Sequence, residues 1–334
     1  MTRQNLFSAK FLPNYTSNAY EIWFAVVIDR ASKKALWLRY STLFSNENTS
    51  PIAPIAVMWA SLFDAQEPNN HLYTAETFPI NSISFLGNNY SYPKGSFSLE
   101  KLSGSLTKGK LTWDLAYQHQ FEAFDYVPSL IKGSPLKNFV KTHSVSCSPF
   151  AKVNGTIKFN EITYTLNNAS GVLTHIWGTN RVEKLFWIFI PIFDNDTEGW
   201  ALEVASVRLK PFLPAITVIK LLHNTTLYYD SSLLSTLSAT VKVNYPEIEV
   251  KTRCKDFKLW VKAKLNLEQI TPYIYRNPDG KPRYIEQSDV GEAICTIEKK
   301  DKKLELATKT GAAVEFHGLS PWSNRTYLDP YNQK

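Results

Sequence analysis

The residues best suited to chemistry lie in one stretch, Gly171–Asp194, which reads GVLTHIWGTNRVEKLFWIFIPIFD. His175 and Trp177 stand two positions apart there, and side chains two apart in a β-strand point to the same face of the sheet. If that face is the inside of a barrel, the two rings form one wall of a pocket. A histidine held in such a wall could donate a proton, and an aromatic face could stabilise a cation formed beside it.

The elements that must position this stretch are short, evenly spaced strands joined by turn residues. A hairpin is predicted from Glu21–Asp29 and Ala35–Phe44, and a tight meander runs over residues 96–118. Residues 1–19 and 122–140 are interpreted as an irregular arm and a long loop. Without a long amphipathic helix, and with β-branched and aromatic residues dominant, the pattern is typical of meandering antiparallel β-structure.

The second strand of the hairpin shows how side chains should divide between two faces. Trp37, Arg39 and Ser41 share one face of that strand, whereas Leu38 and Tyr40 lie on the other.

The length of the chain predicts two barrels. About ten strands fall before residue 180 and a similar number after it. Because a barrel of eight to ten strands takes about 120–170 residues, the 334 residues accommodate two barrels better than one sheet. We therefore predict an all-β protein with two antiparallel β-barrels side by side, residues 1–180 and residues 181–334. No strict sequence repeat accompanies this duplication of pattern.

The formal net charge is +7 and the isoelectric point is about 9.0. A basic balance is typical of proteins that bind nucleic acid or an anionic membrane surface. Lys and Arg are dispersed along this sequence, however, so we expect no nucleic-acid partner. Peripheral contact with a membrane surface is kept as an alternative.

Cysteine spacing and short motifs indicate whether a metal ion or a cofactor should be expected. Cys147, Cys254 and Cys295 lie far apart, without the Cys or Cys/His spacing of a zinc site. No signal peptide or membrane-length apolar run is evident. We therefore expect a reduced, cytoplasmic protein without a metal ion. Phosphate-binding loops, GxSxG elbows and HExxH motifs are also missing from the sequence, so we expect no cofactor. The oligomeric state is left open.

Four short motifs together resemble a known group of proteins. They are EIWF (Glu21–Phe24), GSLTKGKLTWDLAY (Gly104–Tyr117), GVLTHIWG (Gly171–Gly178) and AAVEFHG (Ala312–Gly318). Their order and spacing resemble the double-lipocalin superfamily, which includes carotenoid 1,2-hydratases, tocopherol cyclases and AttH-like proteins. The resemblance implies two lipocalin-like barrels and a hydrophobic small-molecule ligand of isoprenoid type. Several members carry a carboxylate directly after the histidine, as in HEWG, whereas this chain has Ile176.

The resemblance also implies a set of site residues. Carotenoid hydration and chromanol cyclisation begin with protonation of an alkene, which needs an acid in a dry cavity surrounded by aromatic faces. His175 is then the first candidate for the catalytic acid and Asp114, in the WDLAY strand, is the second; Glu21, Asp194 and Glu315 are alternatives. The predicted ligand contacts are Trp177, Trp187, Trp23, Trp59, Tyr117, Glu21 and Glu315.

Each of these residues also has a structural interpretation. His175 could bond a loop carbonyl and close the mouth of the barrel, the tryptophans could be core, and Asp114 could be a turn or ladder partner. Glu315 and His317 share a strand face and are interpreted as a surface pair. Three hypotheses stay open: a binder of a hydrophobic, isoprenoid-type molecule, a cofactor-independent hydratase or cyclase with a buried acid, and a structural or interaction protein with a filled core.

Overall fold

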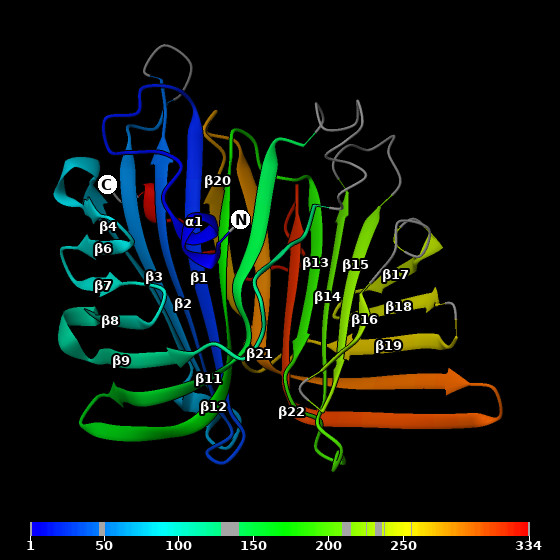
Figure 1. Ribbon diagram of the computed structural model, residues 1–334. Helices are drawn as coiled ribbons and strands as arrows, with labels where there is room; N and C mark the ends of the chain where they lie inside the picture. Colours follow the sequence, from blue (N-terminus) through cyan, green and yellow to red (C-terminus); the bar gives the residue numbers. More distant parts are fainter. Residues whose placement is uncertain are drawn as a thin grey trace.

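The computed structural model describes residues 2–46, 51–127, 140–208, 215–224, 226–230, 236, 238–254 and 256–332. Its strands form two antiparallel sheets of 12 and 10 strands, which stand side by side in Figure 1. The prediction of an all-β protein with two lipocalin-like antiparallel barrels is therefore confirmed.

The first sheet occupies the N-terminal half of the chain. Its strands are β1 (Ala19–Asp29), β2 (Lys34–Phe44), β3 (Ile55–Asp64), β4 (Leu72–Pro79), β5 (Ser84–Leu86), β6 (Asn89–Tyr92), β7 (Gly95–Phe97), β8 (Lys101–Leu106), β9 (Leu111–Gln118), β10 (Phe124–Asp125), β11 (Thr142–Phe159) and β12 (Ile162–Gly178). Short helical elements among the described residues are α1 (Arg3–Phe7), η1 (Pro68–Asn70), η2 (Ile80–Ser82), η3 (Thr107–Gly109) and, near the C-terminus, η5 (Pro330–Asn332).

The second sheet begins after a short connection. Its strands are β13 (Lys184–Ile190), β14 (Trp200–Arg208), β15 (Ile216–His223), β16 (Thr226–Asp230), β17 (Thr240–Asn244), β18 (Glu247–Arg253), β19 (Lys258–Lys264), β20 (Thr271–Arg276), β21 (Pro282–Lys299) and β22 (Lys302–Gly318). The stretch Gly171–Asp194 thus contains the end of the first sheet and the start of the second. A division into independently folding units at residues 1–180 and 181–334 stays a prediction.

The two sheets repeat one strand order. Neighbours run β4-β3-β2-β1-β12-β11-β9-β8-β7 in the first sheet and β16-β15-β14-β13-β22-β21-β19-β18-β17 in the second. β10 and β20 each pair with the long strand that follows them, β11 and β21. The duplication that the sequence showed only as a pattern is present in the topology.

Each sheet curls because its two longest strands pair with one group of strands along one half and with another group along the other half. Residues 170–178 of β12 pair with β1, whereas residues 152–159 of β11 pair with β9. Along residues 146–155 of β11 its pairing with β12 shifts register three times, and such bulges bend a strand. Figure 1 shows the result, in which β11 and β12 turn from the upright group of strands into the horizontal group.

The N-terminal arm, residues 2–18, differs from the predicted irregular segment because it contains helix α1. The side chain of Thr2 caps this helix by accepting a hydrogen bond from the backbone N–H of Asn5. Phe7 at its end is fully buried, with its ring edge-on to Trp23 and Tyr90 inside the first barrel. The arm therefore fills part of the barrel. Most of the loop predicted for residues 122–140 lies outside the described residues.

The central strands are buried on both faces. Every residue of β2 is buried, and all but one of β1. Trp23, Ala25 and Val27 belong to the core inside the first barrel. The alternate residues join a second apolar cluster between the two sheets, here called the seam, which includes Val26, Trp37, Trp59, Trp187, Phe189 and Tyr273.

Polar contacts fasten the seam from the second half of the chain. The hydroxyl of Tyr273 in β20 lies 2.8 Å from Oγ of Ser61 in β3, and its ring stacks on Trp37. Gln269 Oε1 accepts a 2.7 Å hydrogen bond from the backbone N–H of Asp64. The two sheets therefore share one packed interface.

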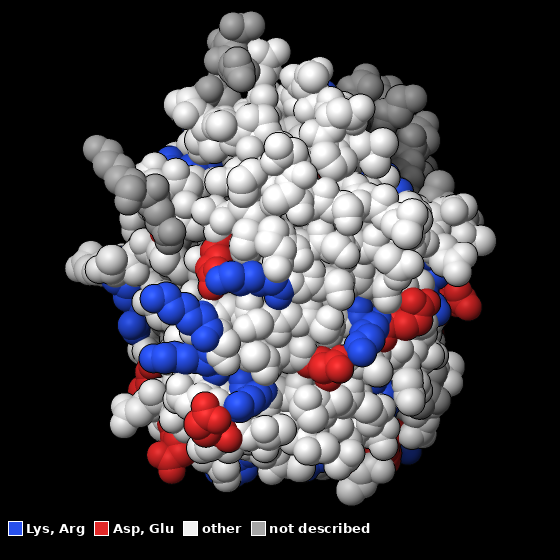
Figure 2. Space-filling model, turned by 90° about the vertical axis from the view of Figure 1, so that its left-hand side faces the viewer, with Lys and Arg blue, Asp and Glu red and all other residues white. Residues whose placement is uncertain are grey.

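The distribution of surface charge and the length of the helices are relevant to the nucleic-acid and membrane partners considered from the sequence. On the side shown in Figure 2, basic and acidic side chains lie beside one another. Ion pairs at the surface include Lys94–Glu76 and Lys101–Asp114. Among the described residues, no helix has the length and apolar character needed to cross a membrane. Cys147, Cys254 and Cys295 are buried, and none of them is in a disulfide with another described residue.

Candidate functional site

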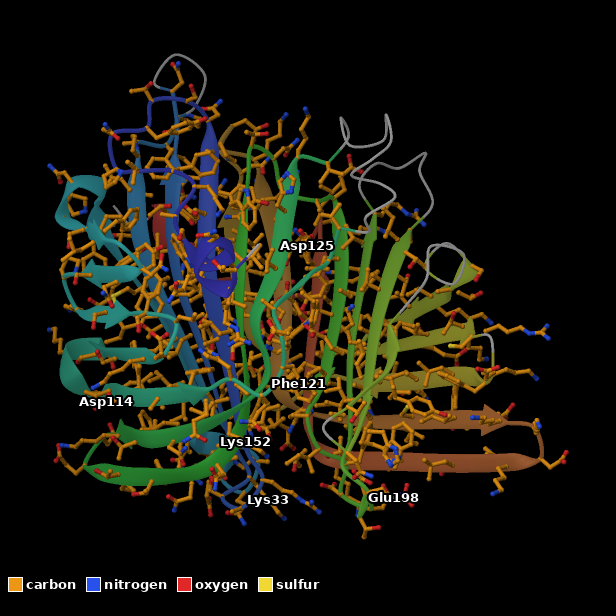
Figure 3. The ribbon with its side chains drawn as sticks, in the orientation of Figure 1. Lys33, Asp114, Phe121, Asp125, Lys152 and Glu198 are labelled. Carbon is orange, nitrogen blue, oxygen red and sulfur yellow. The ribbon has the colours of Figure 1, made fainter. Side chains whose placement is uncertain are left out.

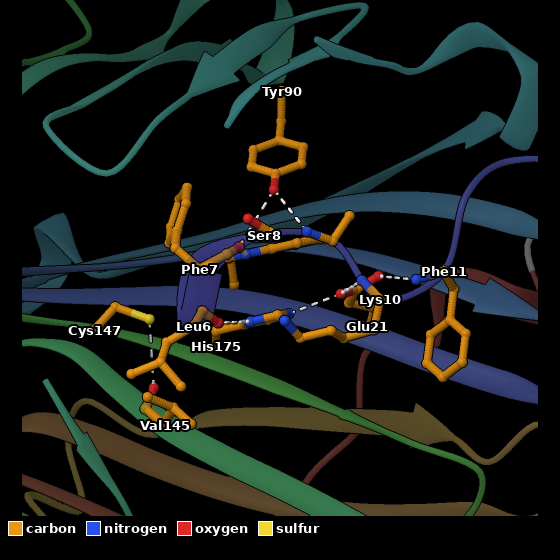
Figure 4. Close-up of polar contacts among 12 residues, drawn as sticks. Leu6, Phe7, Ser8, Lys10, Phe11, Glu21, Tyr90, Val145, Cys147 and His175 are labelled. Carbon is orange, nitrogen blue, oxygen red and sulfur yellow. Dashed lines mark hydrogen bonds and ion pairs between the residues drawn. The ribbon is translucent and has the colours of Figure 1, made fainter. Parts of the chain in front are cut away.

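His175 points into the first barrel, where it holds the arm in place. Its Nδ1 donates to the carbonyl oxygen of Leu6 at 2.7 Å, and its Nε2 lies 2.8 Å from Oε1 of Glu21 (Figure 4). Neither the His175 nor the Glu21 side chain is exposed. The ring of His175 also stacks on Trp23, at 4.7 Å between centroids and 3° between planes. His175 is thus enclosed by core, and it bonds a carbonyl of the arm.

Glu21 of β1 is the carboxylate partner of His175. Its carboxylate accepts the backbone N–H groups of Lys10 at 2.6 Å and Phe11 at 3.1 Å. The pair therefore joins β1, β12 and the arm through a fully used set of polar groups.

The space for a ligand lies on the opposite face of the same strands. A cavity of about 130 Å³ opens in the seam, and Ile176 and Thr174 line it. Because side chains alternate along β12, His175 and Trp177 point away from it. The position at which several double-lipocalin proteins carry a carboxylate therefore faces this cavity. Its wall also includes Tyr20, Phe24, Trp37, Arg39, Tyr126, Arg181, Trp187, Tyr275, Glu315 and His317.

Two titratable residues of β22 face the cavity together. Burial raises the pKa of the Glu315 carboxyl to about 7, although Arg39 and Arg181 act in the opposite direction. Burial, with Arg181 next in importance, lowers the pKa of His317 well below its usual value. Glu315 Oε1 and His317 Nδ1 are 4.0 Å apart. Near neutral pH the cavity thus holds a carboxyl that can still carry its proton and a neutral imidazole that can accept one.

A second buried carboxyl stands behind the cavity wall. Glu203 of β14 accepts a 2.8 Å hydrogen bond from Nε1 of Trp187 and another from the hydroxyl of Tyr126. Burial raises the pKa of Glu203 to about 7, against the effect of these two donors. Trp187 and Tyr126 both line the cavity, so Glu203 orients part of its wall.

The residues predicted from sequence fall into three places. Trp187 and Glu315 line the cavity, and Trp59 lies one layer behind it, 5.4 Å from the ring of Tyr275. Asp114 is exposed on β9, where it forms an ion pair with Lys101 at 3.0 Å (Figure 3). The remaining residues belong to the core inside the first barrel or pack against it: His175, Glu21, Trp23, Tyr117 and Trp177.

The interpretation of Glu315 and His317 as a surface pair was wrong. Their side chains are only 14% and 5% exposed, and both line the cavity. The reason is that the second sheet turns this face of β22 toward the first sheet rather than toward solvent.

The sequence interpretation also missed Arg39, Arg181, Tyr126, Tyr275 and Glu203 as residues of the site or its support. Arg39 and Glu203 carried a signal, because each is a charged side chain inside a largely apolar strand. Among the described residues, no three His, Cys, Asp or Glu side chains are grouped so that they could hold a metal ion.

Comparisons with known proteins identify the fold. A scan against protein-family models finds no match, and a search of the curated proteins finds none either. Among solved structures, an AttH protein from Nitrosomonas europaea is similar with a TM-score of 0.56 and 8% identity, over 93% of this chain and 97% of that chain.

Two further structures have the same architecture. CghA with Sch210972 is similar with a TM-score of 0.54 and 9% identity, over 90% of this chain and 88% of that chain. Kievitone hydratase from Nectria haematococca is similar with a TM-score of 0.52 and 11% identity, over 93% of this chain and 91% of that chain. The double-lipocalin resemblance of the sequence motifs is therefore confirmed at the level of the fold.

The contacts of His175 predict a structural role that substitution can test. The change His175→Ala leaves the buried Glu21 carboxylate without its partner, so we expect the free energy of unfolding in urea to fall by about 3–5 kcal/mol. Limited proteolysis should release the arm more readily. His223→Ala is the control, because His223 is 29% exposed beside Glu198 and should cost about 1 kcal/mol or less. If His175→Ala lowers the free energy of unfolding no more than His223→Ala does, and the arm stays resistant to proteolysis, then His175 does not anchor the arm.

The raised pKa of Glu203 predicts a pH dependence of stability. Between about pH 4.5, its unfolded value, and about pH 7, the folded state binds more protons than the unfolded state, so stability falls as the pH rises. Glu203→Gln removes this contribution, which is on the order of 1–3 kcal/mol, and the variant should lose less stability between pH 5 and pH 8 than the wild type. Glu161→Gln, at a 95% exposed side chain, should leave the wild-type slope. An unchanged slope for Glu203→Gln would show that Glu203 does not hold its proton.

Proposed function

We propose that this double-lipocalin chain binds a hydrophobic small molecule of isoprenoid type in the seam cavity. The observation that carries the proposal is the cavity itself, whose wall is mostly aromatic and aliphatic with a few charged groups directed into it. Small-molecule sites in proteins have this composition.

The size of the cavity limits what it can hold without rearrangement. A dry cavity of about 150 Å³ accepts benzene in a protein core. The seam cavity, at about 130 Å³, therefore holds a ring or a short branched segment of a ligand. A longer isoprenoid requires side chains of the wall to change rotamer, as is common at binding sites.

The solved structures support a small-molecule function for this fold. One of them is CghA with Sch210972, and another is named kievitone hydratase. These names describe those two proteins. Together with a cavity between the sheets they favour a ligand-binding role here over a protein with a filled core.

A second candidate is acid catalysis in the same cavity, as in a cofactor-independent hydratase or cyclase. The observation that favours it is Glu315, a carboxyl with a pKa of about 7 that faces the cavity among aromatic rings. A general acid works best when its pKa lies near the working pH. In this proposal the acid is Glu315, whereas His175 supports the first barrel. The nearby guanidinium groups of Arg39 and Arg181 disfavour a free carbocation, so protonation must be coupled to ring closure or to attack by water.

Filling the cavity tests the binding proposal. Ala205 lines the cavity, and a larger side chain there should occupy the ligand space. We expect the purified wild type to release a hydrophobic molecule into organic solvent, or to bind members of a panel of retinoids, quinones and carotenoids by tryptophan fluorescence. Ala205→Phe should weaken that binding at least tenfold, by roughly 1.4 kcal/mol or more.

The matched control is Ala201→Phe, four residues earlier in β14, because Ala201 lines a different cleft. It should bind as the wild type does. A ligand-free wild type that also ignores the panel, or full binding by Ala205→Phe, would refute the proposed site.

Replacing Glu315 tests the catalytic candidate. Glu315→Gln keeps the shape of the side chain but cannot donate a proton, so turnover of any panel substrate should fall about 100-fold or more while ligand affinity changes little. The wild-type rate should fall as the pH rises through about 7, because the active form is protonated. Asp114→Asn, at the exposed residue, is the control and should keep wild-type turnover. Unchanged turnover in Glu315→Gln, measured by product analysis, would exclude Glu315 as the acid.

A further inference from the structure

A buried guanidinium without a carboxylate partner faces the seam cavity. Arg39 of β2 is 2% exposed, and its Nε and Nη2 have no hydrogen-bond partner among the described residues. Its Cζ lies 3.6 Å from the ring centroid of Tyr275 and 5.2 Å from that of Trp59. The two rings hold the guanidinium in place, and the Tyr275 side chain also forms a hydrogen bond with Arg39, but Nε and Nη2 are left without an acceptor among the described residues.

A second buried guanidinium lies on the same cavity. Arg181, in the connection between the sheets, is 6% exposed, and its Nε donates to the carbonyl oxygen of Arg276 at 3.0 Å. Its Cζ lies 4.1 Å from the ring centroid of Tyr20. Burial and the charge of Arg39 lower the pKa of Arg181 to about 10, so it remains charged at neutral pH.

The charges of the cavity do not balance among the described residues. Glu315 is the carboxylate in its wall, and no ion pair within 4.0 Å joins Glu315 to Arg39 or Arg181 among those residues. Two positive charges therefore face at most one negative charge. Burying unpaired charge is unfavourable, and aromatic faces compensate for it only in part.

We propose that the ligand of the seam cavity carries one negative charge, a carboxylate or an ionised enol, which pairs with Arg39 and Arg181. This inference rests on the proposed function and names the chemical class of its ligand. One anionic ligand offsets one of the two guanidiniums, and the Glu315 carboxyl offsets the other whenever it is ionised. The guanidinium fork matches a planar carboxylate, and its free Nε and Nη2 are the pair of donors that bidentate recognition uses.

Matched acid and alcohol ligands test the inference. Geranic acid with geraniol, and retinoic acid with retinol, share their hydrocarbon chains and differ in a carboxylate against a hydroxyl. Titration at pH 8, followed by the fluorescence of Trp37 and Trp187 in the cavity wall, should show at least tenfold tighter binding of the acid in a pair that binds. Arg39→Met and Arg181→Met should each reduce this preference below threefold and keep the affinity for the alcohol.

The control is Arg30→Met, which removes the same charge from a 51% exposed side chain beside Asp194 and should keep the full preference. Thermal melting identifies any variant that does not fold, and in that case the wild-type preference alone decides. Equal affinity for acid and alcohol would overturn the inference and leave the proposed function standing. Failure of all four ligands to bind would overturn both, and tighter binding of geranyl phosphate than of geranic acid would overturn the assignment to a monoanion.

Discussion

Strands β1, β2 and β3 and residues 169–175 of β12 are buried on both faces, and the arrangement of the molecule depends on this constraint. Each strand must supply one set of side chains to the inside of the first barrel and the alternate set to the seam. A shift of one residue changes the set to which a side chain belongs. His175 consequently lies in a closed core, whereas its neighbour Ile176 faces the cavity.

The arm decides which of the two faces is left for a ligand. Phe7 and the carbonyl of Leu6 enter the first barrel, where Trp23 and His175 bond to them. Glu21 accepts the backbone N–H groups of Lys10 and Phe11, further along the arm. Trp23 donates its indole N–H to the carbonyl of Phe7 at 3.0 Å, so this chain segment is held by polar bonds as well as by packing. A barrel of this size that is filled by side chains has no room for a ligand.

The fold was predictable because strand spacing, turn residues and motif order are local properties of the sequence. The alternation in the hairpin was predicted as well, and the register of β1 with β2 places Trp37 and Arg39 on the seam face and Tyr40 in the barrel. Alternation does not say which face encloses a cavity when both faces are apolar. For that reason the sequence analysis assigned His175 and Trp177 to the wall of a pocket, although their face of β12 belongs to the core of the first barrel.

The rest of the site depends on contacts between the two halves of the chain. Arg181 stands in a polar connection, GTNR, which is indistinguishable by composition from an exposed turn. Glu315 and His317 alternate with apolar residues, and this pattern is the same for a strand that faces solvent and one that faces a buried cavity. Only the packing of the second sheet on the first decides between them.

Burial in the seam explains two unusual features of the cavity. It holds the pKa of Glu315 near 7 even though two guanidiniums act to lower it, and it leaves Nε and Nη2 of Arg39 without a hydrogen-bond partner among the described residues. An anion bound between Arg39 and Arg181 would cancel their effect on Glu315. The protonated form of Glu315 would then be stabilised relative to the ionised form. Ligand binding and proton retention therefore favour each other in this cavity, a coupling that neither sheet could produce alone, because Arg39 comes from the first sheet and Glu315 from the second.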